Sequence, residues 1–104
     1  MSFIRYEIIL PTRYNDGSPV ESDKFDDVLQ EIGERFGGVT FFPETLRGVW
    51  LHEGQRFDES NVRLVVDVED SPENADFFVS YKRTLKDRFR QIDLWIISYE
   101  IRIV

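Results

Sequence analysis

Apolar and polar residues alternate with a period of two in residues 3–10 and again in residues 62–69. The apolar positions are Ile4, Tyr6, Ile8 and Leu10 in the first segment and Val62, Leu64, Val66 and Val68 in the second. This spacing is typical of a strand that buries one face. Pro11 ends the first strand, and the turn-forming residues 15–19 predict a loop after it.

Two other segments repeat their apolar residues with helical spacing. The stripes consist of Phe25, Val28, Leu29, Ile32 and Phe36 in the first segment and of Ala75, Phe78, Tyr81, Leu85 and Phe89 in the second. Apolar residues three and four positions apart form one face of an amphipathic helix. Ser18 or Ser22 is the predicted cap of the first helix, and Gly37 and Gly38 are predicted to end it. Ser71 followed by Pro72 predicts the start of the second.

The remaining apolar residues predict two more strands. Within residues 93–104, one face carries Trp95, Ile97, Tyr99, Ile101 and Ile103, and we expect this face to pack on the core. Residues 39–52 are less regular, because Pro43 interrupts the first apolar run and a turn at Glu53 and Gly54 follows the second. They predict one strand whose register stays open.

The order strand, helix, strand, strand, helix, strand predicts an α+β protein. Two βαβ-type crossovers around a central hairpin produce the ferredoxin-like βαββαβ sandwich. Its antiparallel sheet has the strand order four, one, three, two and carries both helices on one face. At 104 residues, the chain has room for a single domain over residues 1–104.

The charge of the chain limits its partners. Thirteen basic and twenty acidic residues give a formal net charge of -7, so we expect no binding to nucleic acid or to an anionic membrane surface. No apolar stretch approaches the roughly 18 residues of a membrane span, and Arg5 and Glu7 interrupt the N-terminal apolar run, unlike a signal peptide. The chain has no cysteine, and thus no disulfide or thiolate site. We expect a cytoplasmic protein without a cofactor.

The chain contains, in order, the stretches IILPTRYNDGSPVE, FGGVTFFPE and FFVSYKRTLKDRFRQ, followed by the terminal strand. In these stretches it resembles small uncharacterised bacterial proteins of the same length. The resemblance covers nearly the whole chain and rests on helix, turn and core residues. It implies a bacterial ferredoxin-like domain of no known activity and assigns no catalytic residue.

Groups that could carry chemistry are few. His52 is the single histidine, but Arg56 stands where a zincin motif would place its second histidine. The carboxylates of residues 67–76 are explained by cross-strand pairing and by the dipole at a helix start, without a metal ion. The basic residues Lys82, Lys86 and Arg90 follow the spacing of a solvated helix face. The sequence therefore predicts no catalytic residue and no metal site, and it weighs against an enzyme.

Apolar residues predicted on the open face of the sheet offer a contact surface. Antiparallel pairing is expected to bring Ile9, Val65, Leu94 and Ile96 together at one end of that face, and Trp50 joins them if Val49 and Leu51 point at the helices. Monomers seldom leave such a patch in water. We therefore expect an interaction or regulatory module that forms a homodimer or binds a small protein partner.

An alternative function uses the same end of the sheet as a pocket. Trp50 and His52, with Arg13 and Tyr14 from the first loop, would then bind an organic ligand in a small enzyme or a ligand-sensing domain. A deep pocket would favour this alternative, and a flat, self-complementary face would favour the interaction module.

Overall fold

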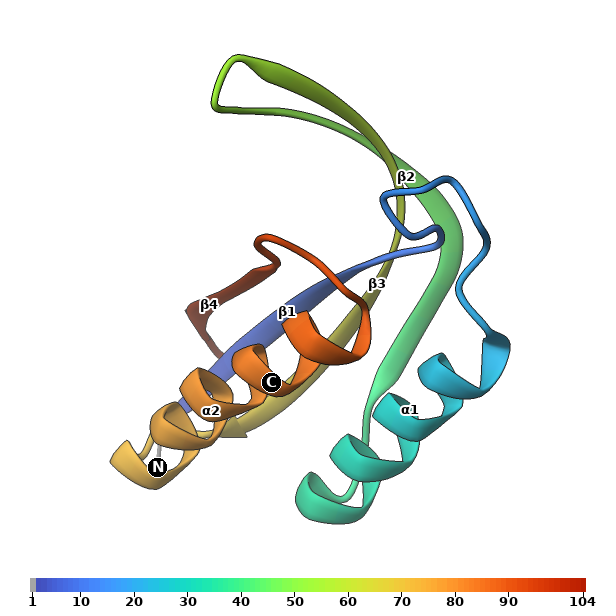
Figure 1. The fold of residues 1–104 in the computed structure, drawn as a ribbon. Coiled ribbons are helices and arrows are strands. Elements are labelled where there is room, and N and C mark those ends of the chain that lie inside the picture. The colour runs from blue at the N-terminus through green and yellow to red at the C-terminus, as the bar shows by residue number, and fades with distance from the viewer. Residues whose placement is uncertain (1) are drawn as a thin grey trace.

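The computed structural model describes residues 2–104 and has the predicted order of elements (Figure 1). The strands are β1 (Phe3–Pro11), β2 (Thr40–His52), β3 (Gln55–Glu69) and β4 (Trp95–Ile101). They form one antiparallel sheet in the order β2-β3-β1-β4. Helices α1 (Ser22–Phe36) and α2 (Pro72–Arg88) cover one face of it. The predicted ferredoxin-like α+β sandwich is confirmed.

The two helices begin differently. At α2 the prediction is confirmed, because the Ser71 side chain accepts a hydrogen bond from the backbone N–H of Asn74 at 3.2 Å and Pro72 occupies the first turn. Helix α1 begins at Ser22 after Glu21, which makes no side-chain cap. Ser18 instead lies in the preceding turn, where its backbone N–H donates to the Asp16 carboxylate at 2.8 Å.

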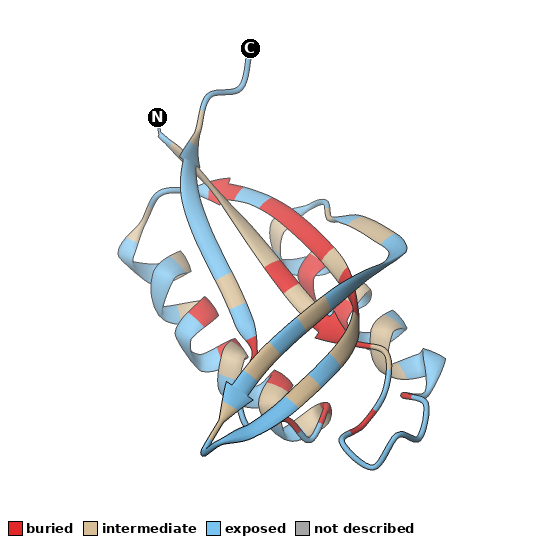
Figure 2. Ribbon diagram, turned by 90° about the horizontal axis from the view of Figure 1, so that it is seen from above, coloured by how far each residue is buried: buried red, intermediate tan, exposed pale blue. Residues whose placement is uncertain are grey.

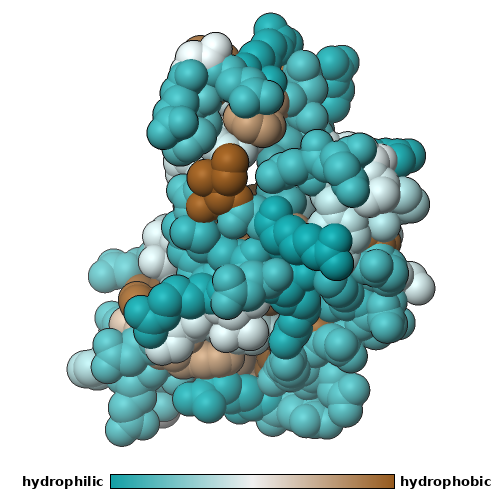
Figure 3. Space-filling view, in the orientation of Figure 1, coloured by the Kyte–Doolittle hydropathy of each residue, from teal (hydrophilic) through white to brown (hydrophobic). Residues whose placement is uncertain are grey.

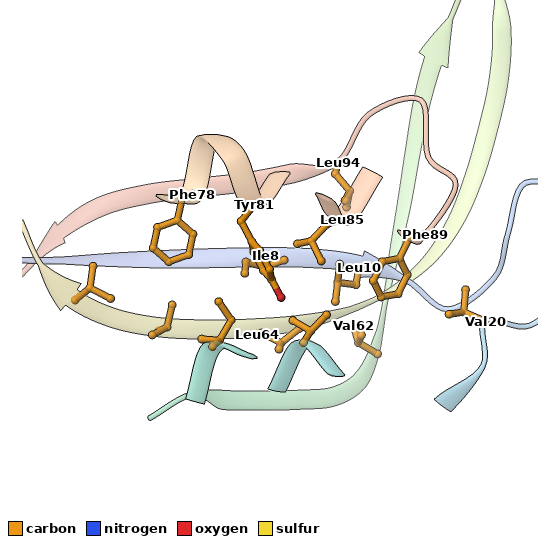
Figure 4. Close-up of a cluster of buried hydrophobic side chains, with 14 of the residues drawn as sticks. Ile8, Leu10, Val20, Val62, Leu64, Phe78, Tyr81, Leu85, Phe89 and Leu94 are labelled. Carbon is orange, nitrogen blue, oxygen red and sulfur yellow. The ribbon is translucent and has the colours of Figure 1, made fainter. Parts of the chain in front are cut away.

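The core lies between the helices and the sheet. Helix α2 contributes Phe78, Tyr81 and Leu85, and Figure 4 shows them directed at the central strands. The fully buried side chains are those of Phe89, Ile8, Leu10, Ile32, Leu64, Leu85 and Val28. Ala75, which the helical stripe predicts to be buried, is exposed, and the Phe77 ring packs instead against Phe36, with ring centroids 5.4 Å apart.

The prediction for the face of β4 was wrong. Ile8 pairs with Ile96 and Ile9 pairs with Trp95, so Ile96 shares the helix-covered face with Ile8, and Trp95 shares the open face with Ile9. Leu94, just before the strand, is 4 % exposed in the core, whereas Trp95 is 68 % exposed. A shift of one residue moves every side chain of a strand to the other face, so Ile97, Tyr99 and Ile101 also lie on the open face.

Strands β2 and β3 continue well beyond the rest of the sheet. Strand β1 pairs with β3 only from Asn61 to Glu69, so residues 46–60 form a two-stranded hairpin, here called the arm. Figure 1 shows the arm extending past the sheet and bending over the side where β4 begins, and Figure 2 shows that it is far less buried than the central strands. The sheet tolerates Pro43 because β2 is an edge strand with a register shift between Phe42 and Leu46.

Candidate functional site

The arm and the start of β4 enclose a cleft of about 290 Å³ on the open-face side of the sheet. We call it the arm cleft. Its lining includes Ile9, Trp50, Glu59, Asn61, Gln91 and Trp95. Strands β1 and β3, the arm and the connection from α2 to β4 thus each contribute to it.

The position of Trp50 follows from the pairing of the arm. Trp50 pairs with Phe57, and the two rings stack with centroids 4.6 Å apart and an angle of 20° between their planes. His52 lies two residues further along the same strand face, 5.8 Å from Trp50 between ring centroids. Trp50 and His52 therefore face the same side as Ile9, as the interface hypothesis required. Val49 and Leu51 point the opposite way, but they are 54 % and 72 % exposed because the arm extends past the helices.

The connection between α2 and β4 forms the rim of the arm cleft. The Gln91 side chain donates to the backbone oxygen of Phe89 at 2.9 Å. The Asp93 carboxylate accepts the backbone N–H of Leu94 at 2.8 Å and lies 3.1 Å from the Lys82 ammonium group. These interactions, the backbone hydrogen bond first, hold the pKa of Asp93 below its usual value. Asp93 therefore keeps a negative charge at the rim near neutral pH.

Charged groups on the open face are paired within the chain. Arg5 binds Asp67 through two hydrogen bonds of 2.7 and 2.9 Å. The Arg63 guanidinium lies 3.4 Å from the Glu7 carboxylate. The Tyr99 hydroxyl also donates to Glu7, and this hydrogen bond raises the pKa of Tyr99 above its usual value. The open face thus combines exposed apolar side chains with two ion pairs, and the carboxylates of Glu59 and Glu69 lie on the same face outside these pairs.

The structure places the five predicted interface residues on both faces of the sheet. Ile9 and Trp50 line the arm cleft. Val65 lies on the open face beside Glu7, but it is only 8 % exposed. Ile96 does not lie on the open face, because the register of β4 directs it toward the helices. Leu94, just before β4, is a core residue that also lines the arm cleft. On the open face, β4 presents Trp95 and Ile97 in place of Leu94 and Ile96.

The four residues of the predicted ligand pocket do not converge. Trp50 lines the arm cleft, whereas Arg13 and Tyr14 line a second cavity of about 350 Å³ between the first loop and the arm. His52 lines neither of them. Tyr14 is a core residue with 6 % exposure, and its hydroxyl donates to the Glu21 carboxylate.

The remaining charged groups form structural pairs. Asp67 is bound by Arg5, as described, and no group of three or more possible metal ligands occurs within residues 2–104. On α2, Arg88 binds Glu31 of α1 through hydrogen bonds of 2.6 and 2.8 Å, and Lys82 pairs with Asp93. Of the basic residues predicted on a solvated helix face, Lys82 is thus paired with the loop before β4, and the neighbouring Arg88 joins α2 to α1.

Sequence reasoning missed Trp95, Ile97, Tyr99, Asn61 and Gln91 as members of this surface. For β4 the pattern held no decisive signal, because residues 94–97 are apolar at every position. On the opposite side of the molecule, where the helices lie, Figure 3 shows a mostly hydrophilic surface with a few separate hydrophobic spots.

Comparisons with known proteins show similarity of fold. No protein-family model and no curated protein sequence matches the chain. Among solved structures, it is similar to a divalent cation tolerance protein, CutA1, from Thermus thermophilus, with a TM-score of 0.66 and 13% identity over 98% of this chain and 86% of the other. It is also similar to a phage SAM lyase in complex with S-methyl-5'-thioadenosine, with a TM-score of 0.68 and 17% identity over 97% and 90%.

A third similar structure is a GlnK–ATP complex from B. subtilis, with a TM-score of 0.61 and 19% identity over 96% of this chain and 82% of the other. At these identities the comparisons establish a shared fold. That fold is ferredoxin-like. Neither described helix is long and apolar enough to cross a membrane.

Proposed function

We propose that this protein is a small interaction or regulatory module that self-associates through the open face of its sheet. The observation that carries the proposal is the apolar surface of β4. Trp95, Ile97 and Tyr99 lie on one face of a single strand and are 68 %, 40 % and 43 % exposed. A cluster of large apolar side chains in water marks an interaction surface.

The paired charges of the open face favour a second copy of the chain as the partner. Two chains of net charge -7 repel each other at long range. On the open face, however, Arg5 neutralises Asp67 and Arg63 neutralises Glu7. These two pairs add no net charge where two such faces meet, so the remaining like charge there comes from Glu59 and Glu69. The same patch on both copies suits a symmetric dimer.

The free edge of β4 adds to this surface. Strand β4 pairs only with β1 and ends the sheet, so its outer edge presents backbone N–H and C=O groups to solvent. An exposed apolar edge is a template for pairing with another chain. A contact over this edge and the open face would cover both the free backbone groups and the exposed apolar side chains of β4.

The association of the purified chain tests the proposal. We expect sedimentation over a concentration series to detect a dimer, and Trp95→Ala to lower the association constant by about tenfold or more, as for a central aromatic residue of an interface. The unfolding midpoint of Trp95→Ala should change little, because the side chain is 68 % exposed.

A matched control is Val79→Ala, which removes a 63 % exposed apolar side chain from α2 on the other side of the molecule. It should leave the association constant unchanged. A wild-type chain that stays monomeric at high concentration, or an equal loss in both variants, would contradict the proposal.

A further inference from the structure

The buried polar side chains of the protein meet at the arm cleft. Within residues 2–104, the buried residues that are polar are Asn61 and Gln91, at 7 % and 8 % exposure. Both line the arm cleft, although they come from β3 and from the connection after α2. Burying two carboxamides at one site is unfavourable unless their polar atoms find partners.

The two carboxamides differ in their hydrogen bonds. The Gln91 side chain donates to the backbone oxygen of Phe89. No side-chain hydrogen bond of the described residues includes the Asn61 carboxamide, and its polar atoms are not among the shielded atoms without a partner, so they remain accessible from the cleft that Asn61 lines. Gly48 lies next to it, and a Cβ atom at position 48 would come within 3.1 Å of Asn61 Nδ2. Asn61 therefore offers the cleft one acceptor oxygen and two donor hydrogens.

Two indole rings line the same cleft. Stacking on Phe57 restrains Trp50, and Trp95 stands at the start of β4 with 68 % of its surface exposed. Aromatic faces favour contact with other planar rings, which they bind largely without regard to sequence or substituent. The cleft thus provides surfaces for the face of a planar ligand and a carboxamide for its edge.

The charges and the volume of the cleft restrict the ligand further. Arg47 is the only basic residue in the described lining, and the carboxylates of Glu59 and Asp93 oppose it. This balance disfavours a phosphorylated or otherwise anionic compound. A volume of about 290 Å³ is at the lower end of small-molecule sites, which suits a compound of one or two rings.

We propose that the arm cleft binds an uncharged planar heteroaromatic compound, with Asn61 pairing to adjacent donor and acceptor groups on its edge and Trp50 and Trp95 contacting its rings. This inference goes beyond self-association and requires residues of one copy only.

The two tryptophans of the chain provide a direct measurement, because both line the cleft. We expect adenosine, used as a probe with such an edge, to change the tryptophan fluorescence in a saturable manner. Purine riboside lacks the exocyclic amino group, and it should bind about tenfold more weakly, as expected for the loss of one well-made hydrogen bond to a buried group. ATP should bind more weakly than adenosine.

Variants at Asn61 separate pairing from simple stacking. Asn61→Leu and the isosteric Asn61→Asp should each weaken adenosine binding about tenfold, whereas Asn15→Leu, an exposed asparagine outside the cleft, should not. Thermal unfolding is used to check that each variant is folded. If Asn61→Leu does not fold, Asn61→Asp alone provides the test.

Three results would overturn the proposal: no saturable change at millimolar adenosine, equal binding by wild type and both Asn61 variants, or tighter binding of ATP than of adenosine. Repeating the titration at several protein concentrations separates the fluorescence change caused by adenosine from any change caused by self-association. Because Trp95 belongs to both proposed contacts, the ligand site is tested at a protein concentration where the chain is monomeric. A chain that is always monomeric but binds adenosine would refute the dimer alone, and a chain that dimerises but gives no response as a monomer would refute the ligand site alone.

Discussion

At the scale of single residues, the large side chains at the C-terminal end of α2 and just after it link the helices to the sheet. Phe89 follows the last residue of α2, is fully buried, and packs against Phe25, with ring centroids 5.4 Å apart. Leu85, one turn earlier, is also fully buried. These residues join the helix, the first loop and the central strands in one cluster.

Phe89 gives the first stability prediction. Phe89→Ala should lower the free energy of unfolding by about 3–5 kcal/mol, the range for a buried phenylalanine whose removal leaves a cavity. Denaturant unfolding measures this change. Val79→Ala, on the exposed side of α2, should change the free energy of unfolding by less than about 0.5 kcal/mol. An unchanged midpoint in Phe89→Ala would mean that the ring does not fill the core.

At the scale of elements, the end of α1 depends on backbone conformation. Gly37 has a φ of 83°, and its N–H donates to the Gly33 oxygen at 2.9 Å. A side chain is strained in this left-handed conformation, whereas glycine adopts it freely. The adjacent Gly38 has no such φ, and a Cβ atom there would meet nothing within 4 Å.

The two neighbouring glycines form a matched pair of variants. Gly37→Ala should lower the free energy of unfolding by about 1 kcal/mol, the cost of placing a β-carbon in the left-handed region. Gly38→Ala should be neutral or slightly stabilising, because it restricts the unfolded chain without strain in the folded one. Equal effects of the two substitutions in thermal or denaturant unfolding would show that the cap does not govern the end of α1.

At the scale of the whole molecule, net charge and surface pattern act in opposite directions. The chain carries a formal net charge of -7, yet the proposed contact face pairs Arg5 with Asp67 and Arg63 with Glu7. Repulsion between copies therefore comes from charges outside these two pairs, which include Glu59 and Glu69 on the open face. Salt screens such charges over a Debye length of about 10 Å at 0.1 M.

Self-association should consequently strengthen with ionic strength. We expect the association constant to rise between about 50 and 500 mM NaCl as repulsion is screened, while the apolar contact of Trp95 and Ile97 persists. Sedimentation equilibrium at several salt concentrations measures this. An association that weakens with salt would show that ion pairs between the copies hold the dimer together, contrary to the paired charges seen on the open face.

The helices, the central strands and the faces that they bury could be predicted from the sequence. Alternation in residues 62–69 and the stripes that contain Ile32 and Leu85 determined the central strands, the helices and the face that each buries. Ser71 with Pro72 marked the start of α2, and Gly37 with Gly38 marked the end of α1, where Gly37 forms the cap. These signals are local, because the period of a pattern and the conformational limits of proline and glycine belong to the segment itself.

The face of β4 and the arm cleft were decided by tertiary structure. Residues 94–97 are all apolar, so the local pattern allowed either face, and pairing of Ile9 with Trp95 chose between them. The arm exists because β3 is longer than its neighbour β1. The sequence of β3 alone does not show where the pairing with β1 ends. Asn61, Gln91, Trp50 and Trp95 become one site only when the arm bends over the start of β4. Strand register and the meeting of distant segments depend on contacts between elements, and a one-residue difference in register reverses which side chains reach the core and which reach the cleft.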